Sequence, residues 1–253
     1  MAANVSAGAT AGLEVRKDGA VTRLVLQRPH VGNSLSNALV VDLSAAVDAG
    51  HADGTRMLVI EGSGANFCTG FDLSQLDSET DDSLLARFVR IELLLQKIHQ
   101  APFVTVALAR GRATGAGADL FAACEQRWIV DSAKYSFPGA AFGIVLGTSR
   151  LSGLVGFARA REWVRTGAMV DADSALQAGL ANRIIANGDL DAALASLEAA
   201  AQRLDAATLA AIHGASLKTQ AADSAADLYR LAVSAAQPGL RERIIQFRAA
   251  SKR

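Results

Sequence analysis

The chain has 253 residues, of which 51% are hydrophobic and 20% are charged. This length and apolar content are enough for a large buried core, so they exclude an intrinsically disordered chain. The 25 basic and 25 acidic residues cancel. This balance excludes a strong net attraction to nucleic acid or to an anionic membrane surface. The longest apolar runs are far shorter than a bilayer requires, so we expect no membrane span.

The cysteine and histidine content limits the chemistry further. Cys68 and Cys124 are too few for a disulfide framework. The first twelve residues lack the basic start and the long apolar stretch of a secretory leader. We therefore expect a protein of the reducing cytoplasm. The four histidines show no metal-ligand spacing, so we expect no metal site.

The first elements in chain order are a β-hairpin and a helix. Residues 14–27 predict two strands around Asp18-Gly19, a dipeptide that suits a tight hairpin turn. Ser36 then has the character of a helix N-cap. Apolar residues at helical spacing follow it at Leu39, Leu43 and Val47.

Strands and helices then alternate along the chain. Continuous apolar runs predict buried strands at residues 57–61, 103–109 and 127–131. Helical patterns lie between them, at residues 84–98 and from about Gly117 onward. Strands separated by helices need crossover connections, so we expect a largely parallel sheet.

The remainder of the chain is predicted to be mostly helical, with one strand at residues 182–186. The last helix carries one apolar stripe, made of Leu240, Ile244 and Phe247. Such a stripe packs either on a neighbouring subunit or on the core of its own chain, and the sequence leaves both open. We expect a core at residues 1–189 and a helical C-terminal region at residues 190–253.

Two glycine-rich segments follow buried strands, at residues 61–73 and 110–120. Small residues there let a ligand approach the backbone, and the second segment runs into a helix whose first N–H groups have no internal partner. Free N–H groups at the positive end of a helix dipole favour negative charge. If both segments face one cavity, each can direct one N–H at the same oxygen atom, which is the geometry of an oxyanion hole.

Two other interpretations of the second segment stay open. Gly115 and Gly117 could serve only close packing of a helix on a strand. The Gly-x-Gly pattern, followed by Asp131 at the end of the next predicted strand, also has features of a dinucleotide-binding turn. Leu120 stands where the third glycine of that turn would fall, and the segment lies in the middle of the chain. Both facts weigh against a dinucleotide site.

Five motifs, in order along nearly the whole chain, resemble those of the crotonase superfamily, the enoyl-CoA hydratase/isomerase group. They are Arg28-Pro29 with Asn33-Ser34-Leu35, residues 67–73 (FCTGFDL), residues 111–120 (GRATGAGADL), residues 133–144, and Arg150-Leu151 with Leu154-Val155-Gly156. The resemblance implies an α/β fold, a crotonase-like ββα spiral core with a helical C-terminal trimerisation region. It further implies a homotrimer or a dimer of trimers, an acyl-CoA thioester as substrate, and no cofactor beyond the coenzyme A of that substrate.

The resemblance also implies site residues. The backbone N–H groups of Phe71 and Ala116 would form the oxyanion hole, where the enolate of a thioester places its negative charge. Substrate contacts are expected from Gly70, Phe71, Asp72, Leu73, Gly115 and Ala116. Within this set we interpret Asp72 as a residue that orders its loop.

The catalytic positions depart from the family pattern. Hydratases of this family carry two glutamates, and Asp119 and Gly139 stand in their places here. We expect Asp119 to transfer the proton, although a carboxylate near a helix start is also explained by the helix dipole alone. A single carboxylate suits double-bond isomerisation better than hydration, while decarboxylation and thioester hydrolysis stay open. A catalytically weak acyl-CoA-binding paralogue is the alternative from another class. Further candidate side chains are Glu61, Tyr135, Ser136, Thr148 and Ser149.

Overall fold

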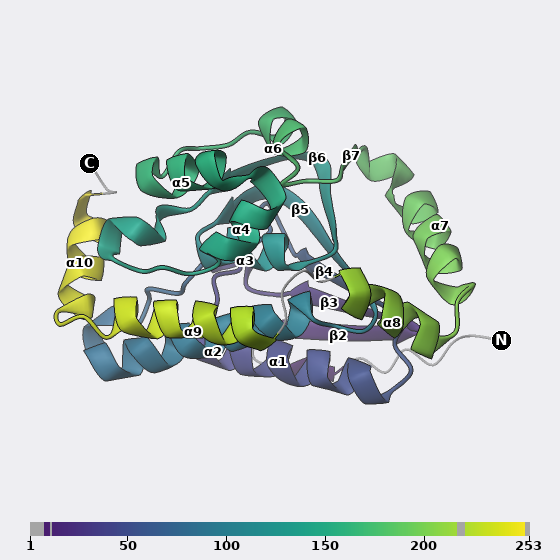
Figure 1. Ribbon diagram of the computed structural model, residues 1–253, viewed down its shortest axis with the longest axis horizontal. Coiled ribbons are helices and arrows are strands. Elements are labelled where there is room, and N and C mark those ends of the chain that lie inside the picture. The colour runs from purple at the N-terminus through teal and green to yellow at the C-terminus, as the bar shows by residue number, and fades with distance from the viewer. Residues whose placement is uncertain (1–7, 11, 217–220, 251–253) are drawn as a thin grey trace.

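The structure is a computed structural model, and it describes residues 8–10, 12–216 and 221–250. Most of the first twelve residues, from which we expect no secretory leader, lie outside this range. The same holds for residues 217–220 and 251–253 of the predicted C-terminal region. The described part forms a seven-stranded sheet in the order β1 to β7, with helices packed around it (Figure 1).

The first three strands of the sheet are antiparallel. β1 (Gly8–Thr10) pairs with β2 (Leu13–Asp18), which pairs with β3 (Val21–Leu26). The β2–β3 pair is the predicted hairpin, and Gly19 has a positive φ of 55° at its turn. β1 is not predicted from the sequence, because its three residues Gly-Ala-Thr carry no apolar alternation.

Every neighbouring pair from β3 to β7 is parallel, as predicted. These strands are β4 (Met57–Gly62), β5 (Val104–Thr114), β6 (Gln126–Ser136) and β7 (Arg183–Ile185). The crossovers contain α1 (Asn37–Ala52), α2 (Asp81–His99) and α3 (Ala116–Ala123). Ser36 caps α1 as predicted, since its hydroxyl accepts a hydrogen bond from the Leu39 N–H at 3.2 Å.

Two strands run further than the sequence predicts. β5 continues through the first half of the segment that we expected to be a glycine-rich turn, and its register is irregular between Ala109 and Gly111. β6 likewise continues past Asp131, which has a positive φ of 60°. Polar residues and a glycine interrupt the apolar pattern at these places, so the periodicity conceals the strand. The turn itself begins only at Gly115.

The remaining helices surround the sheet. They are α4 (Thr148–Val155), α5 (Phe157–Thr166), α6 (Ala172–Ala178), α7 (Leu190–Gln202), α8 (Ala206–Ser216), α9 (Ala221–Ala235) and α10 (Leu240–Ala250). In Figure 1, α1, α2 and α9 run side by side along one edge, and α10 lies at the opposite end of the molecule from α7 and α8. No helix among the described residues has both the length and the apolarity of a membrane span.

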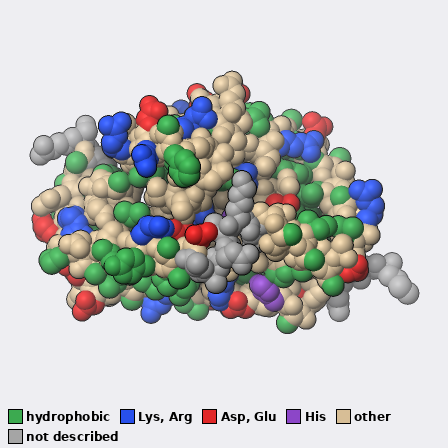
Figure 2. Space-filling model, viewed as in Figure 1, with side chains coloured by type: hydrophobic (Ala, Val, Ile, Leu, Met, Phe, Trp, Pro, Cys, Tyr) green, Lys and Arg blue, Asp and Glu red, His purple; other side chains and the backbone are tan. Residues whose placement is uncertain are grey.

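The apolar residues form three clusters. β4 lies between two of these clusters, because its side chains point alternately to its two faces. Leu58 and Ile60 belong to the cluster under α1 to α3, and Met57 and Val59 belong to the cluster under α7 and α8. The third cluster joins α2 to α9 and α10. Figure 2 shows basic and acidic side chains interspersed over one face of the molecule, in line with the net charge of zero.

The apolar stripe of the last helix packs within the chain. Leu240 and Ile244 are buried in the third cluster, against Leu84 and Phe88 of α2. Of the two alternatives for this stripe, the structure therefore shows packing on the chain's own core. The region from residue 190 onward contributes to both the second and the third cluster.

Close backbone packing joins α3 to the first glycine-rich segment. A Cβ atom at Gly117 would lie 2.1 Å from the carbonyl oxygen of Cys68. Any side chain at this position would push the two backbones apart. The packing interpretation is therefore correct for Gly117, whereas the nearest atom to a Cβ at Gly115 is 3.9 Å away.

We expect Gly117→Ala to lower the free energy of unfolding by roughly 1–3 kcal/mol, because the added methyl group overpacks this contact. Gly153→Ala is the matched control, since Gly153 is exposed on α4 with open space around it. That change should raise the free energy of unfolding by roughly 0.5–1 kcal/mol. Urea denaturation measures both, and equal stabilities of the two variants would contradict the tight contact.

Candidate active site

The two glycine-rich segments meet at the carboxyl ends of β4 and β5 and border a cavity of about 290 Å³. Open α/β sheets commonly bind ligands at this edge. The cavity wall includes Gly70, Phe71, Leu73, Gly115, Ala116 and Asp119. Apart from Asp72, the residues expected to form the oxyanion hole, contact the substrate and transfer the proton thus line one cavity.

The Phe71 N–H has no backbone acceptor among the described residues. The N–H of Leu35 donates to the Gly70 carbonyl at 2.7 Å, and the N–H of Asp72 donates to the Leu35 carbonyl at 3.2 Å. These two bonds hold the chain on both sides of Phe71. They leave the Phe71 N–H itself available to a ligand.

The Ala116 N–H is the second free donor. Gly115 precedes α3 with φ 54° and ψ −128°, a conformation that only glycine adopts readily, and its N–H donates to the Ser136 carbonyl at 2.8 Å. Ala116 opens the helix, and its N–H has no acceptor in the described part of the chain. A Cβ atom on Gly70 would lie 2.5 Å from the Thr114 carbonyl oxygen and 3.4 Å from the Ala116 nitrogen. The two donors therefore lie on adjoining segments of one wall.

The carboxyl group of Asp119 belongs to the same wall. Asp119 is 5% exposed, and no hydrogen bond from a described residue reaches its carboxyl group. Burial raises its pKa to about 8, although the positive charge of Arg150 lowers it. Glu92 raises the pKa as well, and it binds Arg150 through hydrogen bonds of 2.8 and 2.5 Å. A helix dipole acting alone would lower this pKa, so burial dominates here.

Gly147 leaves room for this carboxyl group. A Cβ atom at Gly147 would lie 2.2 Å from Oδ1 of Asp119, and the φ of Gly147 is 65°. The segment before α4 therefore approaches Asp119 as closely as a glycine permits. The sequence analysis did not anticipate this contact, because the two residues are far apart in the chain.

Asp72 holds the first loop and is not part of the cavity wall. Its carboxylate pairs with Arg28 at 2.8 Å and accepts a hydrogen bond from the Ser74 N–H at 2.9 Å. Burial alone would raise the pKa of Asp72, but the bonds from Ser74 and Arg28 bring it below the usual value. Asp72 is thus a buried anion with its partners already in place.

The other candidate side chains are mostly engaged elsewhere. Only Thr148 lines the cavity. Glu61 pairs with Arg23, and Ser149 donates a hydrogen bond to Asp227. The remaining two contribute differently. The Ser136 carbonyl accepts a hydrogen bond from the Gly115 N–H, just before α3, and the Tyr135 hydroxyl is buried outside the cavity wall.

Sequence reasoning missed the apolar part of the wall. Five of the nine phenylalanines line this cavity, namely Phe71, Phe88, Phe137, Phe142 and Phe247. They come from loops, α2, the short helix Pro138–Phe142 and α10. Their concentration becomes apparent only in three dimensions.

Asp119 is the only titratable side chain among the described residues that line the cavity. Burial raises the pKa of the nearby Cys68 thiol to about 12, so this cysteine is not a ready nucleophile. Within the described ranges, His, Cys, Asp and Glu residues form no group of three that could hold a metal ion. The cavity therefore combines one titratable carboxyl group, two free N–H donors and an apolar wall.

The sequence profile of the enoyl-CoA hydratase/isomerase family matches residues 16–237. The chain therefore belongs to this family of enzymes, within the crotonase superfamily. A curated relative, named "Probable enoyl-CoA hydratase echA6" in Mycobacterium leprae, is 37% identical over 180 residues, which are 68% of this chain and 70% of that protein.

Solved structures show the same fold. A protein from Bordetella parapertussis, described as a "putative enoyl-CoA hydratase/isomerase", is 39% identical with a TM-score of 0.91, over 95% of this chain and 99% of that one. A protein from Thermobifida fusca, described as a "putative enoyl-CoA hydratase" in complex with acetoacetyl-CoA, is 30% identical with a TM-score of 0.75, over 88% and 93% of the two chains. These similarities confirm the crotonase fold that the motifs predicted.

The raised pKa of Asp119 gives a stability test. The pKa is about 8 in the folded protein and 3.8 for an ordinary aspartate, so the folded state is favoured by protonation. This contribution is complete below pH 3.8 and is lost as the pH rises through about 8. Asp119→Asn removes the titration, so the variant should melt roughly 2–8 °C above the unsubstituted protein at pH 9, which is on the order of 1–2 kcal/mol.

Differential scanning calorimetry from pH 4 to pH 9 measures this difference. The gap should shrink toward pH 4, where both proteins carry a neutral side chain. Asp191→Asn, on the exposed side of α7, is the control and should show no comparable trend. A variant that melts below the unsubstituted protein at pH 9 would show that Asp119 is a stabilising charge.

Proposed function

We propose that the protein is an enoyl-CoA isomerase, which binds an enoyl-CoA thioester and moves its double bond by a single-carboxylate proton shuttle. The observation that carries this proposal is the composition of the cavity wall. One titratable carboxyl group, Asp119, shares the wall with the unpaired N–H groups of Phe71 and Ala116. The reaction needs one proton-transfer group and stabilisation of one oxyanion, and this cavity offers both.

The two N–H groups stabilise the charged intermediate. When a proton leaves the carbon next to a thioester carbonyl, the negative charge moves to the thioester oxygen. Two fixed N–H donors stabilise this oxygen more in the enolate than in the neutral thioester. The conformation at Gly115 and the hydrogen bonds on both sides of Phe71 fix these donors before the substrate binds.

Asp119 moves the proton in both directions. Its carboxylate takes a proton from C2 of a 3-enoyl thioester, and the electron pair shifts toward the thioester oxygen to form a dienolate. The same carboxyl group then returns the proton to C4, which leaves the double bond between C2 and C3. No atom is gained or lost. Because its pKa is about 8, both forms of Asp119 are accessible near neutral pH.

The residues that line this cavity are less suited to hydration than to isomerisation. Addition of water needs a group that activates the water and a proton donor for C2, and Gly139 contributes no side chain to either task. The nearest atom to a Cβ at Gly139 is 3.5 Å away, the Ile144 carbonyl oxygen. The position therefore has room for a side chain but holds none.

The cavity indicates the size and character of the acyl group. If each non-hydrogen atom takes about as much room as a water molecule, ~30 Å³, the cavity holds roughly ten of them. Apart from Asp119, the side chains of the wall are uncharged, and most are apolar. An unbranched acyl group of medium length fits this space. The Thermobifida fusca complex with acetoacetyl-CoA supports a CoA thioester as the ligand, and no further cofactor is part of the proposal.

The expected activity is conversion of 3-octenoyl-CoA to 2-octenoyl-CoA, followed through the absorbance of the conjugated thioester. Asp119→Asn keeps the size of the side chain but removes the base, so turnover should fall roughly 10²- to 10⁴-fold while binding persists. In the unsubstituted protein kcat/KM should rise with pH and level off above about 8, because the deprotonated carboxylate is the active form.

Gly139→Glu completes this experiment, because it adds a second carboxylate where space exists. It should increase hydration of crotonyl-CoA. Full isomerase activity of Asp119→Asn would contradict the shuttle. Tight binding of CoA thioesters with no turnover of any enoyl-CoA would instead identify a catalytically weak acyl-CoA-binding protein.

We also propose that the protein assembles as a homotrimer or a dimer of trimers. Phe157 and Met169 support a subunit contact, since they are 75% and 60% exposed, which is unusual for such large apolar side chains. Analytical ultracentrifugation at micromolar concentration should show three or six copies of the chain. Substitution of both residues by Ser should shift the distribution toward monomers, and a monomer in the unsubstituted protein would refute the proposal.

A further inference from the structure

Arg87 on α2 contacts the segment that carries the first oxyanion donor. Its guanidinium carbon lies 4.0 Å from the centroid of the Phe71 ring. Its Nη2 donates a hydrogen bond to the Asp72 carbonyl at 3.0 Å. Arg87 is 8% exposed, so both contacts are shielded from water. One side chain thus holds the ring of Phe71 and the backbone that follows it.

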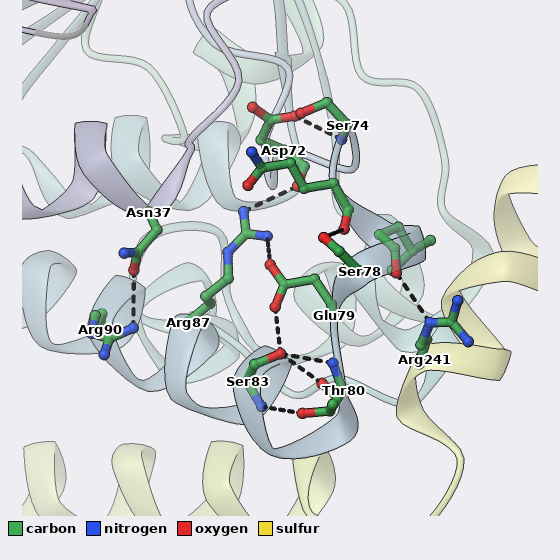
Figure 3. A network of polar contacts seen from close by, with 12 residues as sticks. Asn37, Asp72, Ser74, Ser78, Glu79, Thr80, Ser83, Arg87, Arg90 and Arg241 are labelled. Carbon is green, nitrogen blue, oxygen red and sulfur yellow. Dashed lines mark hydrogen bonds and ion pairs between the residues drawn. The ribbon is translucent and has the colours of Figure 1, made fainter.

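The guanidinium group is itself fixed by Glu79. Nη1 of Arg87 lies 2.5 Å from Oε1 of Glu79, and the other carboxylate oxygen accepts a hydrogen bond from the Ser83 hydroxyl. Ser83 and Thr80 form the capping box of α2. Figure 3 shows this chain of contacts from the start of α2 through Glu79 and Arg87 to Asp72. The residues at the start of α2 therefore fix the orientation of the guanidinium plane, through Glu79.

Arg87 adds to the backbone hydrogen bonds that already hold the Phe71 segment, among them the bond from the Leu35 N–H to the Gly70 carbonyl. The donor belongs to the peptide between Gly70 and Phe71, and Gly70 has a φ of 93°, in a region open chiefly to glycine. A glycine on one side leaves that peptide with little intrinsic preference for its direction. The Phe71 ring also stacks on Phe88, with 4.4 Å between centroids and 18° between planes. Fixing the Phe71 ring and the Asp72 carbonyl, which lies two peptides further along, restrains the chain on the other side of the donor peptide.

We propose that Arg87 is a positioning residue, which aims the Phe71 N–H at the thioester oxygen by stacking on the Phe71 ring and bonding the Asp72 carbonyl. The inference rests on the oxyanion hole of the proposed function. Lysine cannot replace arginine here, because an ammonium group cannot lie flat on the ring while it bonds both Glu79 and the carbonyl. The substitution Arg87→Lys therefore keeps the charge and removes the geometry.

Acetoacetyl-CoA is a direct probe of this geometry. It loses a proton between its two carbonyl groups to form an enolate, which has its own ultraviolet absorbance. N–H donors that face the thioester oxygen favour the enolate and lower the pH at which the bound ligand ionises. A titration of bound acetoacetyl-CoA thus reports the strength of the hole without any turnover. The Asp119→Asn background removes the titration of the neighbouring carboxyl group.

In that background the bound ligand should ionise at a lower pH than free acetoacetyl-CoA. Arg87→Lys should raise the midpoint by about one pH unit, a tenfold change in the ionisation equilibrium, while the affinity for the neutral ligand changes less than about threefold. Arg90→Lys is the matched control. Arg90 lies one turn further along α2, is exposed, and donates to the Asn37 side chain at 2.9 Å, so its substitution should leave the midpoint in place.

Glu79→Gln supplies a second variant, because it leaves the guanidinium group on the ring and weakens only its anchor. The midpoint should shift in the same direction but less. If Arg87→Lys does not fold, Glu79→Gln decides the question. An unchanged midpoint in the folded variants would overturn the role of Arg87, even with a lowered melting temperature. Failure of the background protein to lower the midpoint at all would instead refute the oxyanion hole, and with it the proposed function.

Discussion

The site depends on one close backbone contact, between residues 67–73 and the segment that joins β5 to α3. The Cys68 N–H donates to the Arg112 carbonyl at 3.1 Å, and the Thr114 N–H donates to the Cys68 carbonyl at 3.0 Å. Gly117 allows α3 to begin directly against this strand-like pair. Without this approach, Phe71 and Ala116 would not share a wall. Gly117 thus allows the two segments to pack closely, whereas Gly70 and Gly115 give the backbone the angles it needs next to the two N–H donors.

A second constraint is the electrostatic state of the cavity. Asp119 is buried without a hydrogen-bonding partner among the described residues, and Arg150, whose positive charge lowers the pKa of Asp119, is already bound by Glu92. A buried carboxyl group of this kind stays neutral up to about pH 8, and its ionisation reduces stability. Groups that destabilise the fold in this way are common at functional sites. Asp72 shows the opposite arrangement, in which Arg28 and Ser74 stabilise the charged form.

Local sequence patterns predicted much of the fold. The Asp18-Gly19 turn, the Ser36 cap and the buried parallel strands each follow from short-range signals of spacing and turn chemistry. The missed features are those that local patterns do not encode. β1 is too short to show a period, and the extension of β5 past Gly111 is concealed by polar residues that a neighbouring strand supports through hydrogen bonds.

The same limit applies to the site. The glycine-rich segments pointed to a possible oxyanion hole, and the family resemblance pointed to Phe71, Ala116 and Asp119. Arg87, Gly147 and the phenylalanine wall gave no signal, because each acts through a partner distant in the chain.

The central claim is that the N–H groups of Phe71 and Ala116 bind one thioester oxygen. A crystal structure with octanoyl-CoA, which binds without reacting, tests this most directly. We expect the thioester oxygen to lie roughly 2.7–3.1 Å from both nitrogens, with the acyl chain in the phenylalanine-lined cavity and C2 within reach of Asp119. A thioester oxygen that contacts only one of the two nitrogens, or neither, would contradict the account.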